Sequence, residues 1–248
     1  MKITIAGRGK VGKALFRSFR QAGFEVALIS TRELLSANTH VESDMLLLAL
    51  PDNVLQTIDL KGKVLSRTAV IHCAGTLPSD IFNKFTDRYG VFYPSRSFTG
   101  TEEETLQDAH IFVTANHPDT LQQLKDLAVK SGAHVLELTD TQRLQLHIAA
   151  VFAHNFTNHM IFIAKKISAE ASVPFSVILD LLKPYFDNLF SGSHPEDLQT
   201  GPAARDDTST IEKHIRLLES HKDWQNIYRF VTQSIRNTVK KHEDNEKF

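Results

Sequence analysis

This sequence is short of cysteine, of long apolar runs and of any excess of one charge. The single cysteine, Cys73, excludes an internal disulfide and any multi-cysteine metal site. The longest apolar run, residues 45–50, stops at Pro51 and is far shorter than the roughly 18–20 residues that span a bilayer. The 28 Lys and Arg nearly balance the 29 Asp and Glu, so nothing favours nucleic acid or an anionic membrane as a partner. The first apolar segment meets Arg8 too early for a secretory leader, so we expect a protein of the reducing cytoplasm.

Short apolar runs alternate with amphipathic stretches through the first 137 residues. We expect strands at residues 3–6, 26–29, 45–50, 69–72, 91–93, 111–113 and 134–136. Helices are expected between several of them, at residues 11–22, 80–87 and 118–131. Near-continuous apolar strands alternating with helices are typical of a parallel sheet covered on both faces. The expected fold class is therefore α/β, with a doubly wound, mostly parallel sheet.

The pattern becomes all-helical after about residue 139. Residues 140–171 contain no Gly or Pro, and a second helix over 174–190 contains Pro184, where we expect a kink. After a Gly- and Pro-rich loop at 191–207, a capping box at residues 209–212 predicts a third helix, and Asp206 and Asp207 also suit a helix cap. Asp223 predicts the cap of a fourth helix, reaching about residue 241. We therefore expect two domains, 1–138 and 139–248. Because a thin helical layer buries little apolar surface alone, we also expect a homodimer formed through the second domain.

A glycine-rich motif follows the first expected strand and begins the first expected helix. It matches G-x-G-x-x-G and consists of Gly7, Arg8, Gly9, Lys10, Val11 and Gly12. The first glycine permits a tight turn, the second lets a pyrophosphate approach the backbone, and the third lets helix and strand pack closely. The helix start then offers free N–H groups to the phosphates. In this context the motif predicts a Rossmann-type dinucleotide site, the alternative being a purely structural turn.

The end of the second expected strand indicates which dinucleotide is bound. NAD sites usually carry an acid there to accept hydrogen bonds from the ribose hydroxyls. This chain has Ser30, Thr31 and Arg32 instead, and a guanidinium suits a bidentate contact to a 2′-phosphate. Glu33 is the dissenting residue, and we expect it to start a short helix and point away. The predicted cofactor is NADP, unless Arg32 is only a solvated surface side chain.

Other candidate residues follow the remaining strands, since ligands of such sheets bind outside the carboxyl ends of the strands. Four of them are further cofactor-binding candidates: Leu50, Pro51, Ala74 and Gly75. Gly75 would let the nicotinamide or the substrate approach the backbone. His72 is either part of this site or a hydrogen-bonded core histidine. Tyr93, at another strand end, is a reserve acid with a reference pKa of about 10.

The long helix expected over residues 140–171 carries a polar stripe. At 100° per residue, the stripe comprises His147, Val151, His154, Asn155 and Asn158. We expect His147 to donate a proton and Asn155 to orient a carbonyl or imine. The histidine spacing does not match zinc ligands, so we expect no metal site. The alternative is a solvated or interhelical hydrogen-bonding face.

Several of these segments together resemble a family of bacterial Rossmann-like proteins. That family has a helical carboxyl-terminal domain of unknown function, and its members are described as NADP oxidoreductases. The resemblance covers nearly the whole chain and rests on residues 7–12, 72–76, 90–94, 147–152, 155–159 and 199–203. More distantly, the layout is similar to pyrroline-carboxylate reductases and β-hydroxyacid dehydrogenases, which imply a dimerising helical domain. The dehydrogenases carry a catalytic lysine where this chain has His147 and Asn155, whereas Lys165 and Lys166 come much later.

The sequence thus predicts an NADP-dependent oxidoreductase. It would move a hydride between the nicotinamide and a small C=O or C=N substrate while the protein supplies a proton. The alternative is a non-catalytic NADP-binding sensor or interaction protein, because a fold by itself does not establish a function.

Overall fold

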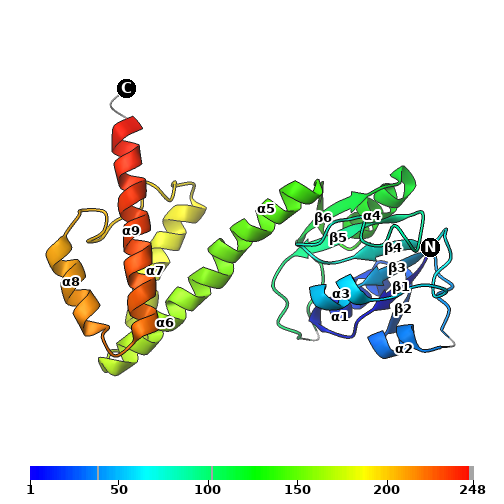
Figure 1. Ribbon diagram of the computed structural model, residues 1–248, viewed down its shortest axis with the longest axis horizontal. Coiled ribbons are helices and arrows are strands. Elements are labelled where there is room, and N and C mark those ends of the chain that lie inside the picture. Colours follow the sequence, from blue (N-terminus) through cyan, green and yellow to red (C-terminus); the bar gives the residue numbers. More distant parts are fainter. Residues whose placement is uncertain (38, 102, 246–248) are drawn as a thin grey trace. The chain divides into compact units, whose positions relative to one another are not determined.

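The computed structural model describes residues 1–37, 39–101 and 103–245. The chain divides into two compact units, Met1–Ala153 and His154–Phe248 (Figure 1). The division between the two units falls within the helical stretch after the last strand. The domain boundary expected from the sequence is residue 138, directly after that strand. The first unit therefore includes the helix Asp140–Ala150 as well as the sheet.

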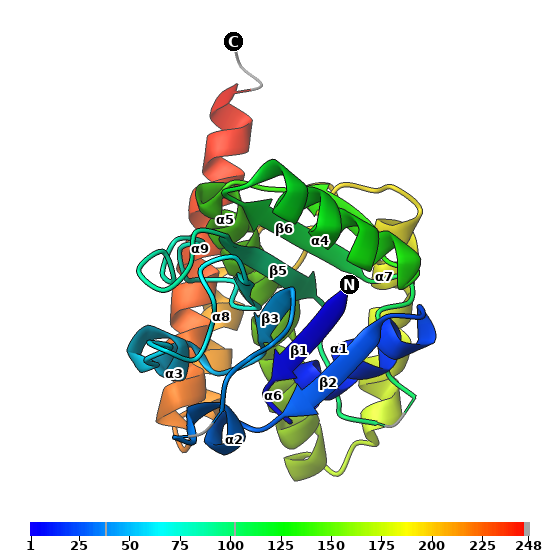
Figure 2. The same ribbon diagram turned by 90° about the vertical axis from the view of Figure 1, so that its right-hand side faces the viewer.

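One seven-stranded sheet organises the first unit, with the order β2-β1-β3-β4-β5-β6-β7. Figure 2 shows β2, β1 and β3 side by side, with β5 and β6 further along the sheet. Its strands are β1 Lys2–Ala6, β2 Glu25–Ile29, β3 Met45–Leu48, β4 Ala69–His72, β5 Tyr89–Ser95, β6 His110–Ala115 and β7 His134–Glu137. Every pairing is parallel except that of β5 with β6. None of the described residues between these two strands is helical, and a parallel pairing would need a crossover, usually a helix. The expectation of a doubly wound, mostly parallel sheet is confirmed.

Both faces of the sheet are buried, as the continuous apolar strands predicted. On β3, Met45 and Leu47 join one core cluster with Leu15, Phe19 and Leu124 from the helices α1 (Lys10–Gln21) and α4 (Pro118–Lys130). Leu46 and Leu48 join the other cluster with residues of α2 (Thr31–Leu35) and α3 (Asp52–Thr57). Because side chains alternate along a strand, two clusters on opposite faces require every strand position to be apolar.

The order in which strands are added to the sheet reverses between β1 and β3. Because these two strands are parallel neighbours, their carboxyl ends lie side by side at one edge of the sheet. From β1 the chain passes to β2 on one side and then returns to β3 on the other. The backbone N–H of Ala49 bonds the Ala6 carbonyl at 2.9 Å, and that of Gly7 bonds the Ile29 carbonyl at 2.9 Å. A strand-order reversal of this kind is where doubly wound sheets bind ligands.

The prediction of a helix over residues 80–87 is wrong. The backbone there forms turns, with Asn83 N–H bonding the Asp80 carbonyl and Phe85 N–H bonding the Phe82 carbonyl. Thr86 then directs its hydroxyl at the backbone carbonyls of residues 66 and 68, so that the chain leads directly into β5. These tertiary hydrogen bonds replace those that a continuing helix would make.

The described residues that follow β7 form helices, as expected, and the first of these helices, α5, belongs to the first unit. The stretch expected as one helix contains α5 (Asp140–Ala150), a π-helical segment η1 (Val151–Phe156) and α6 (Thr157–Glu170). The remaining helices are α7 (Phe175–Phe190), which contains Pro184, α8 (Thr208–Leu217) and α9 (Lys222–Asn245).

Two helix starts differ from the sequence prediction. The capping role expected of Asp207 is confirmed: its carboxylate accepts from the Thr210 N–H at 3.0 Å and caps α8, whereas the capping box expected at 209–212 does not start the helix. Asp207 prevails because it both accepts from that N–H and binds the Thr210 hydroxyl at 2.7 Å. Asp223 lies inside the first turn of α9 and does not cap it. Within the described ranges, no helix has the length and apolar character needed to cross a membrane.

Candidate functional site

The glycine motif forms the turn from β1 into α1, and two of its glycines are sterically required. Gly7 has φ +122°, and a Cβ there would lie 2.2 Å from the carbonyl oxygen of Ala49. A Cβ on Gly12 would lie 1.8 Å from the carbonyl oxygen of Gly7, because helix and turn touch at this point. By contrast, apart from the two chain neighbours of Gly9, no described residue has an atom within 4 Å of its Cβ position. The middle glycine therefore faces open space, as a phosphate-binding turn requires.

The start of α1 leaves backbone donors for a ligand. Gly9 is the residue that caps this helix, and it makes no side-chain cap hydrogen bond. The first N–H groups of an α-helix have no partner within the helix, and its positive dipole end favours anions. No acidic side chain lies in the first turn of α1. This helix start can therefore hold a pyrophosphate.

A cavity of about 440 Å³ opens beside this turn at the carboxyl ends of the strands. Its walls come from the glycine turn, from the ends of β3 and β4, and from α5. They consist of Gly9, Lys10, Val11, Ala49, Leu50, Pro51, Asp52, Cys73, Ala74, Gly75, Thr76 and His147. The structure thus brings seven of the thirteen cofactor-binding candidates and one catalytic candidate, His147, to one cavity. The remaining wall residues are Ala49, Asp52, Cys73 and Thr76. They follow strands β3 and β4, at the carboxyl ends where such sheets bind ligands.

The residues after β2 form a compact polar cluster. Ser30 caps α2 in a reciprocal capping box with Glu33, and Glu33 also pairs with Arg8 at 3.0 Å. The hydrogen bond from the Ser30 backbone, with further support from Arg8, lowers the pKa of Glu33. Glu33 does start a short helix as expected, but its carboxylate turns back to Ser30 and Arg8. Arg32 is exposed at the same strand end.

His72 is a core histidine, one of the two alternatives that the sequence left open. It is fully buried, its Nδ1 accepts from the Ala74 N–H at 3.2 Å, and its Nε2 lies 3.0 Å from the Pro78 carbonyl. Nε2 must therefore carry the proton and donate it. Burial lowers the pKa of His72 to about 4, so this side chain is neutral near pH 7.

Tyr93 and His147 form a hydrogen-bonded pair at the cavity. The phenolic oxygen lies 3.0 Å from His147 Nδ1, and the rings meet edge to face with centroids 6.0 Å apart. A Cβ on Gly75 would lie only 2.8 Å from the same Nδ1, so the glycine makes room for the imidazole. Burial raises the pKa of Tyr93, which therefore keeps its proton and donates it to Nδ1. In neutral His147 the ring proton is then on Nε2.

The third catalytic candidate, Asn155, belongs to the second unit, where its Oδ1 lies 3.4 Å from His154 Nδ1. Its catalytic role stays a prediction. The stripe that joined it to His147 was drawn at 100° per residue, and that geometry is wrong between residues 151 and 156. This segment is π-helical, with i→i+5 hydrogen bonds, so each residue advances through a smaller angle than in an α-helix.

Sequence reasoning missed a buried arginine behind the pair. Arg143, with 1% of its surface exposed, lies four residues before His147 and forms an ion pair with Asp140 at 2.8 Å. The sequence did offer a signal for this cluster: Asp140, Arg143 and His147 are spaced by three and four residues, which places them on one face of a helix.

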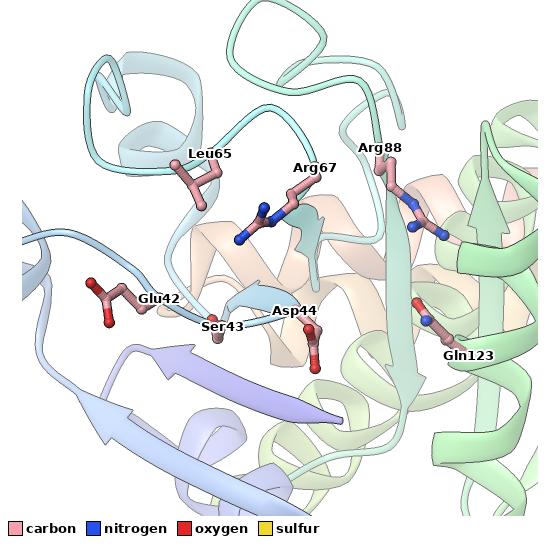
Figure 3. Close-up of a pocket in the computed structure, with 7 residues that line it drawn as sticks. All are labelled: Glu42, Ser43, Asp44, Leu65, Arg67, Arg88 and Gln123. Carbon is pink, nitrogen blue, oxygen red and sulfur yellow. The ribbon is translucent and has the colours of Figure 1, made fainter.

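A second hollow, of about 390 Å³, lies at the opposite ends of the strands (Figure 3). Charges of both signs surround it, with Glu42 and Asp44 facing a region that also holds Arg67 and Arg88. It opens at the amino ends of β3, β4 and β5, away from the glycine turn. Because doubly wound sheets bind their ligands at the carboxyl ends, we assign the candidate site to the first cavity. Among residues 1–37, 39–101 and 103–245, no group of three or more His, Cys, Asp or Glu side chains is placed to hold a metal ion.

Comparison with known proteins agrees with this fold. A family model described as "Domain of unknown function (DUF2520)" matches residues 109–235. A "putative NADP oxidoreductase" of Bacteroides fragilis is 26% identical, with a TM-score of 0.81 over 95% of this chain and 98% of that one. No curated protein matches.

More distant solved structures share the fold. An imine reductase of Myxococcus stipitatus in complex with NADP⁺ is 14% identical, with a TM-score of 0.63 over 99% of this chain and 95% of that one. A 1-pyrroline-5-carboxylate reductase of Streptococcus pyogenes is also 14% identical, with a TM-score of 0.60 over 96% of this chain and 98% of that one. The resemblance inferred from the sequence motifs is confirmed.

Proposed function

We propose that this chain, which belongs to the DUF2520 family, is an NADP-dependent oxidoreductase acting on a small C=O or C=N substrate. The observation that carries the proposal is the position of the Tyr93–His147 pair. His147 lies in the wall of the cavity that also contains Gly9 and Lys10 of the glycine turn. A dinucleotide site and a proton donor in one cavity are the two components that a reductase needs.

The glycine turn supports the cofactor assignment. The open Cβ position of Gly9 and the uncapped start of α1 match the needs of a pyrophosphate. When bound, the nicotinamide cofactor supplies or accepts the hydride. The names of similar proteins, an NADP oxidoreductase and an imine reductase with NADP⁺, agree with this assignment.

NADP is proposed over NAD because of the charges after β2. Arg32 is exposed there and suits a 2′-phosphate, while Ser30 and Thr31 add hydroxyls. Glu33, the residue that would oppose a phosphate, is paired with Arg8 at 3.0 Å. Because the charges of Arg8 and Glu33 balance, the guanidinium of Arg32 gives this cluster a net positive charge.

His147 is the proposed proton donor for reduction. As hydride reaches the carbon of a C=O or C=N bond, the oxygen or nitrogen needs one proton to balance the charge. His147 can give that proton from Nε2, because Nδ1 is engaged by Tyr93. The Tyr93 hydroxyl orients the imidazole in both protonation states of the ring. When solvent has protonated Nδ1, Nδ1–H donates to the phenolic oxygen, and loss of the Nε2 proton to the substrate then leaves a neutral imidazole.

The test combines cofactor binding with a screen for turnover. Purified protein is titrated with NADPH, and NADPH oxidation is then followed with panels of imines, ketoacids and simple ketones. His147→Ala should lower turnover by about 10²–10⁴-fold, the usual contribution of general acid catalysis, and leave NADPH affinity nearly unchanged. NADPH binding without turnover on any panel would favour the alternative, a non-catalytic NADP-binding protein.

We also propose that the protein is a homodimer formed through the second unit. Large apolar side chains are exposed along α7 and α9, among them Leu181, Phe190 and Phe230 at 73%, 84% and 79%. Soluble monomers rarely expose large contiguous apolar surfaces, and symmetric pairing of two copies is the commonest way to cover one.

A further inference from the structure

We propose that Arg143 is a positioning residue that holds His147 in register with Tyr93 and Gly75, by fastening α5 to the loop after β4. This inference rests on the proposed role of His147. The supporting contacts all lie within the first unit, Met1–Ala153.

The burial of Arg143 is unusual and needs an explanation. Arginine is almost never fully buried unless it is paired, and this side chain is only 1% exposed. Its guanidinium donates to Asp140 Oδ1 at 2.8 Å, to Thr114 Oγ1 of β6 at 3.3 Å and to the Leu77 carbonyl. One side chain thus connects α5, a sheet strand and the loop after β4.

Asp140 provides a second connection between the same elements. Its Oδ2 accepts from the Ser79 N–H at 2.9 Å and from the Ser79 hydroxyl at 3.1 Å. Burial alone would raise the pKa of Asp140, but the hydrogen bonds from Ser79 and Arg143 outweigh it and lower the pKa. The carboxylate is therefore charged near pH 7 and fastens the first turn of α5 to the loop.

The two elements that Arg143 and Asp140 join, α5 and the loop after β4, also contact each other at His147. His147 lies one helical turn beyond Arg143, on the same face of α5. The loop that receives Arg143 at Leu77 also contains Gly75, whose Cβ position is 2.8 Å from His147 Nδ1 and 3.0 Å from Tyr93 Cζ. A small shift of loop against helix would therefore close or open the space that the imidazole occupies.

The charge of Arg143 also acts on the pair. Burial raises the pKa of Tyr93, and the nearby guanidinium partly offsets that increase. Arg143 thus strengthens the phenol as a hydrogen-bond donor to Nδ1, in addition to placing the helix.

The test measures the state of His147 without needing a substrate. In ¹⁵N spectra, assigned by comparison with His147→Gln, the unmutated protein should show Nδ1 without a proton and Nε2 with one. In Arg143→Met the two signals should move toward each other, because the imidazole is no longer held against Tyr93 and its tautomers interchange. Arg143→Lys, which keeps the charge and a donor, should return them part of the way.

Turnover provides an independent measurement once a substrate is known. A misplacement of about 1 Å can cost roughly 10²-fold in rate, so Arg143→Met should lower kcat by about that factor with KM and the Kd for NADPH nearly unchanged. The matched control is Arg88→Met, which removes another hydrogen-bonded arginine, from the amino end of β5 (Figure 3). The control should lower stability without moving the His147 signals.

The outcomes separate this inference from the proposed function. Unchanged His147 signals in Arg143→Met would overturn the positioning role even if His147 proves catalytic. Moved signals would support the positioning role even if no substrate is reduced. If Arg143→Met does not fold, Asp140→Asn is measured instead. It weakens the same ion pair, and unchanged signals there would equally overturn the inference.

Discussion

The two units of this chain bury their apolar side chains to very different degrees. In the first unit, two clusters cover both faces of a seven-stranded sheet, and residues such as Ile5, Leu47 and Phe92 are fully buried. In the second unit, Ile163, Ala203 and Ile211 are the buried apolar residues among those described. Large side chains such as Phe190 and Leu217 are 84% and 79% exposed there.

The difference shows how the two kinds of structure form a core. A sheet with helices on both faces encloses apolar side chains from every strand position, so one chain is sufficient. A few amphipathic helices in a thin layer leave much apolar surface uncovered. The first unit therefore has the properties of a complete domain, whereas the second leaves many of its large apolar side chains exposed.

The largest expected effect is on the proposed dimer of the second unit. Leu181→Asp places a charge on the exposed apolar face of α7, and burying an unpaired carboxylate costs several kcal/mol. The proposed dimer should weaken by about 10³-fold, since about 1.4 kcal/mol corresponds to a factor of ten. Sedimentation of the unmutated protein should give about twice 27.9 kDa, and the variant should sediment as a monomer.

The matched control for the interface is Leu65→Asp. Leu65 is also an exposed leucine, at 49% against 73% for Leu181, but it lies in the unit that has its own core. This variant should remain dimeric. Monomeric unmutated protein at micromolar concentration would contradict the homodimer proposal.

The next effect concerns the core of the first unit and its dependence on pH. In the native state the pKa of His72 is about 4, and in the unfolded chain it is about 6.5. Between these values the unfolded chain binds a proton that the native state does not, so His72 lowers stability progressively as pH falls from about 6.5 to 4. The loss from this residue should reach about 2–3 kcal/mol at pH 4.5.

His72→Gln isolates this contribution, because glutamine can bond the same backbone groups without titrating. Urea unfolding at pH 7.5 and 4.5 should show a smaller loss of stability for the variant than for the unmutated protein. If both proteins lose the same unfolding free energy between pH 7.5 and 4.5, the prediction for His72 is wrong.

Cofactor selectivity sharpens the comparison, since NADPH should stabilise the first unit only. Charge-assisted hydrogen bonds contribute roughly 1.5–3 kcal/mol, so Arg32→Ala should weaken NADPH binding by about 10- to 150-fold. NADH affinity should change little, because it has no 2′-phosphate. Isothermal titration with both cofactors gives the answer, and equal affinities in the unmutated protein would overturn the NADP assignment.

The smallest effect separates the structural from the binding glycines. Gly12→Ala forces a Cβ to within 1.8 Å of the Gly7 carbonyl oxygen, and such overpacking should cost about 1–3 kcal/mol of stability. In Gly9→Ala, apart from the two chain neighbours, no described residue has an atom within 4 Å of the added methyl group, so the stability of the free protein should be unchanged. It should weaken NADPH binding instead, because its methyl group occupies the space of the phosphate. Equal thermal unfolding of the two variants would contradict this division.

Local patterns in the sequence were sufficient for much of the fold and for the cofactor end of the site. Every expected strand is present, because short, mostly apolar runs of three to six residues fit the strands of a sheet that is covered on both faces. The helix at 80–87 was wrong because hydrogen bonds from Thr86 to a distant loop compete with helix formation. The capping box expected at 209–212 does not start α8 because two oxygens of Asp207 serve Thr210 together.

The sequence by itself determined the glycine turn, since only residues without a Cβ fit at Gly7 and Gly12, and it determined which faces of the strands are apolar. Tertiary structure alone decided that Tyr93 meets His147 across 54 residues and that Arg143 is buried behind them. The physical reason is the range of the interactions. Helix caps and alternation of side chains act between neighbours in the chain, whereas a hydrogen bond between a strand end and a later helix depends on how all the intervening elements pack.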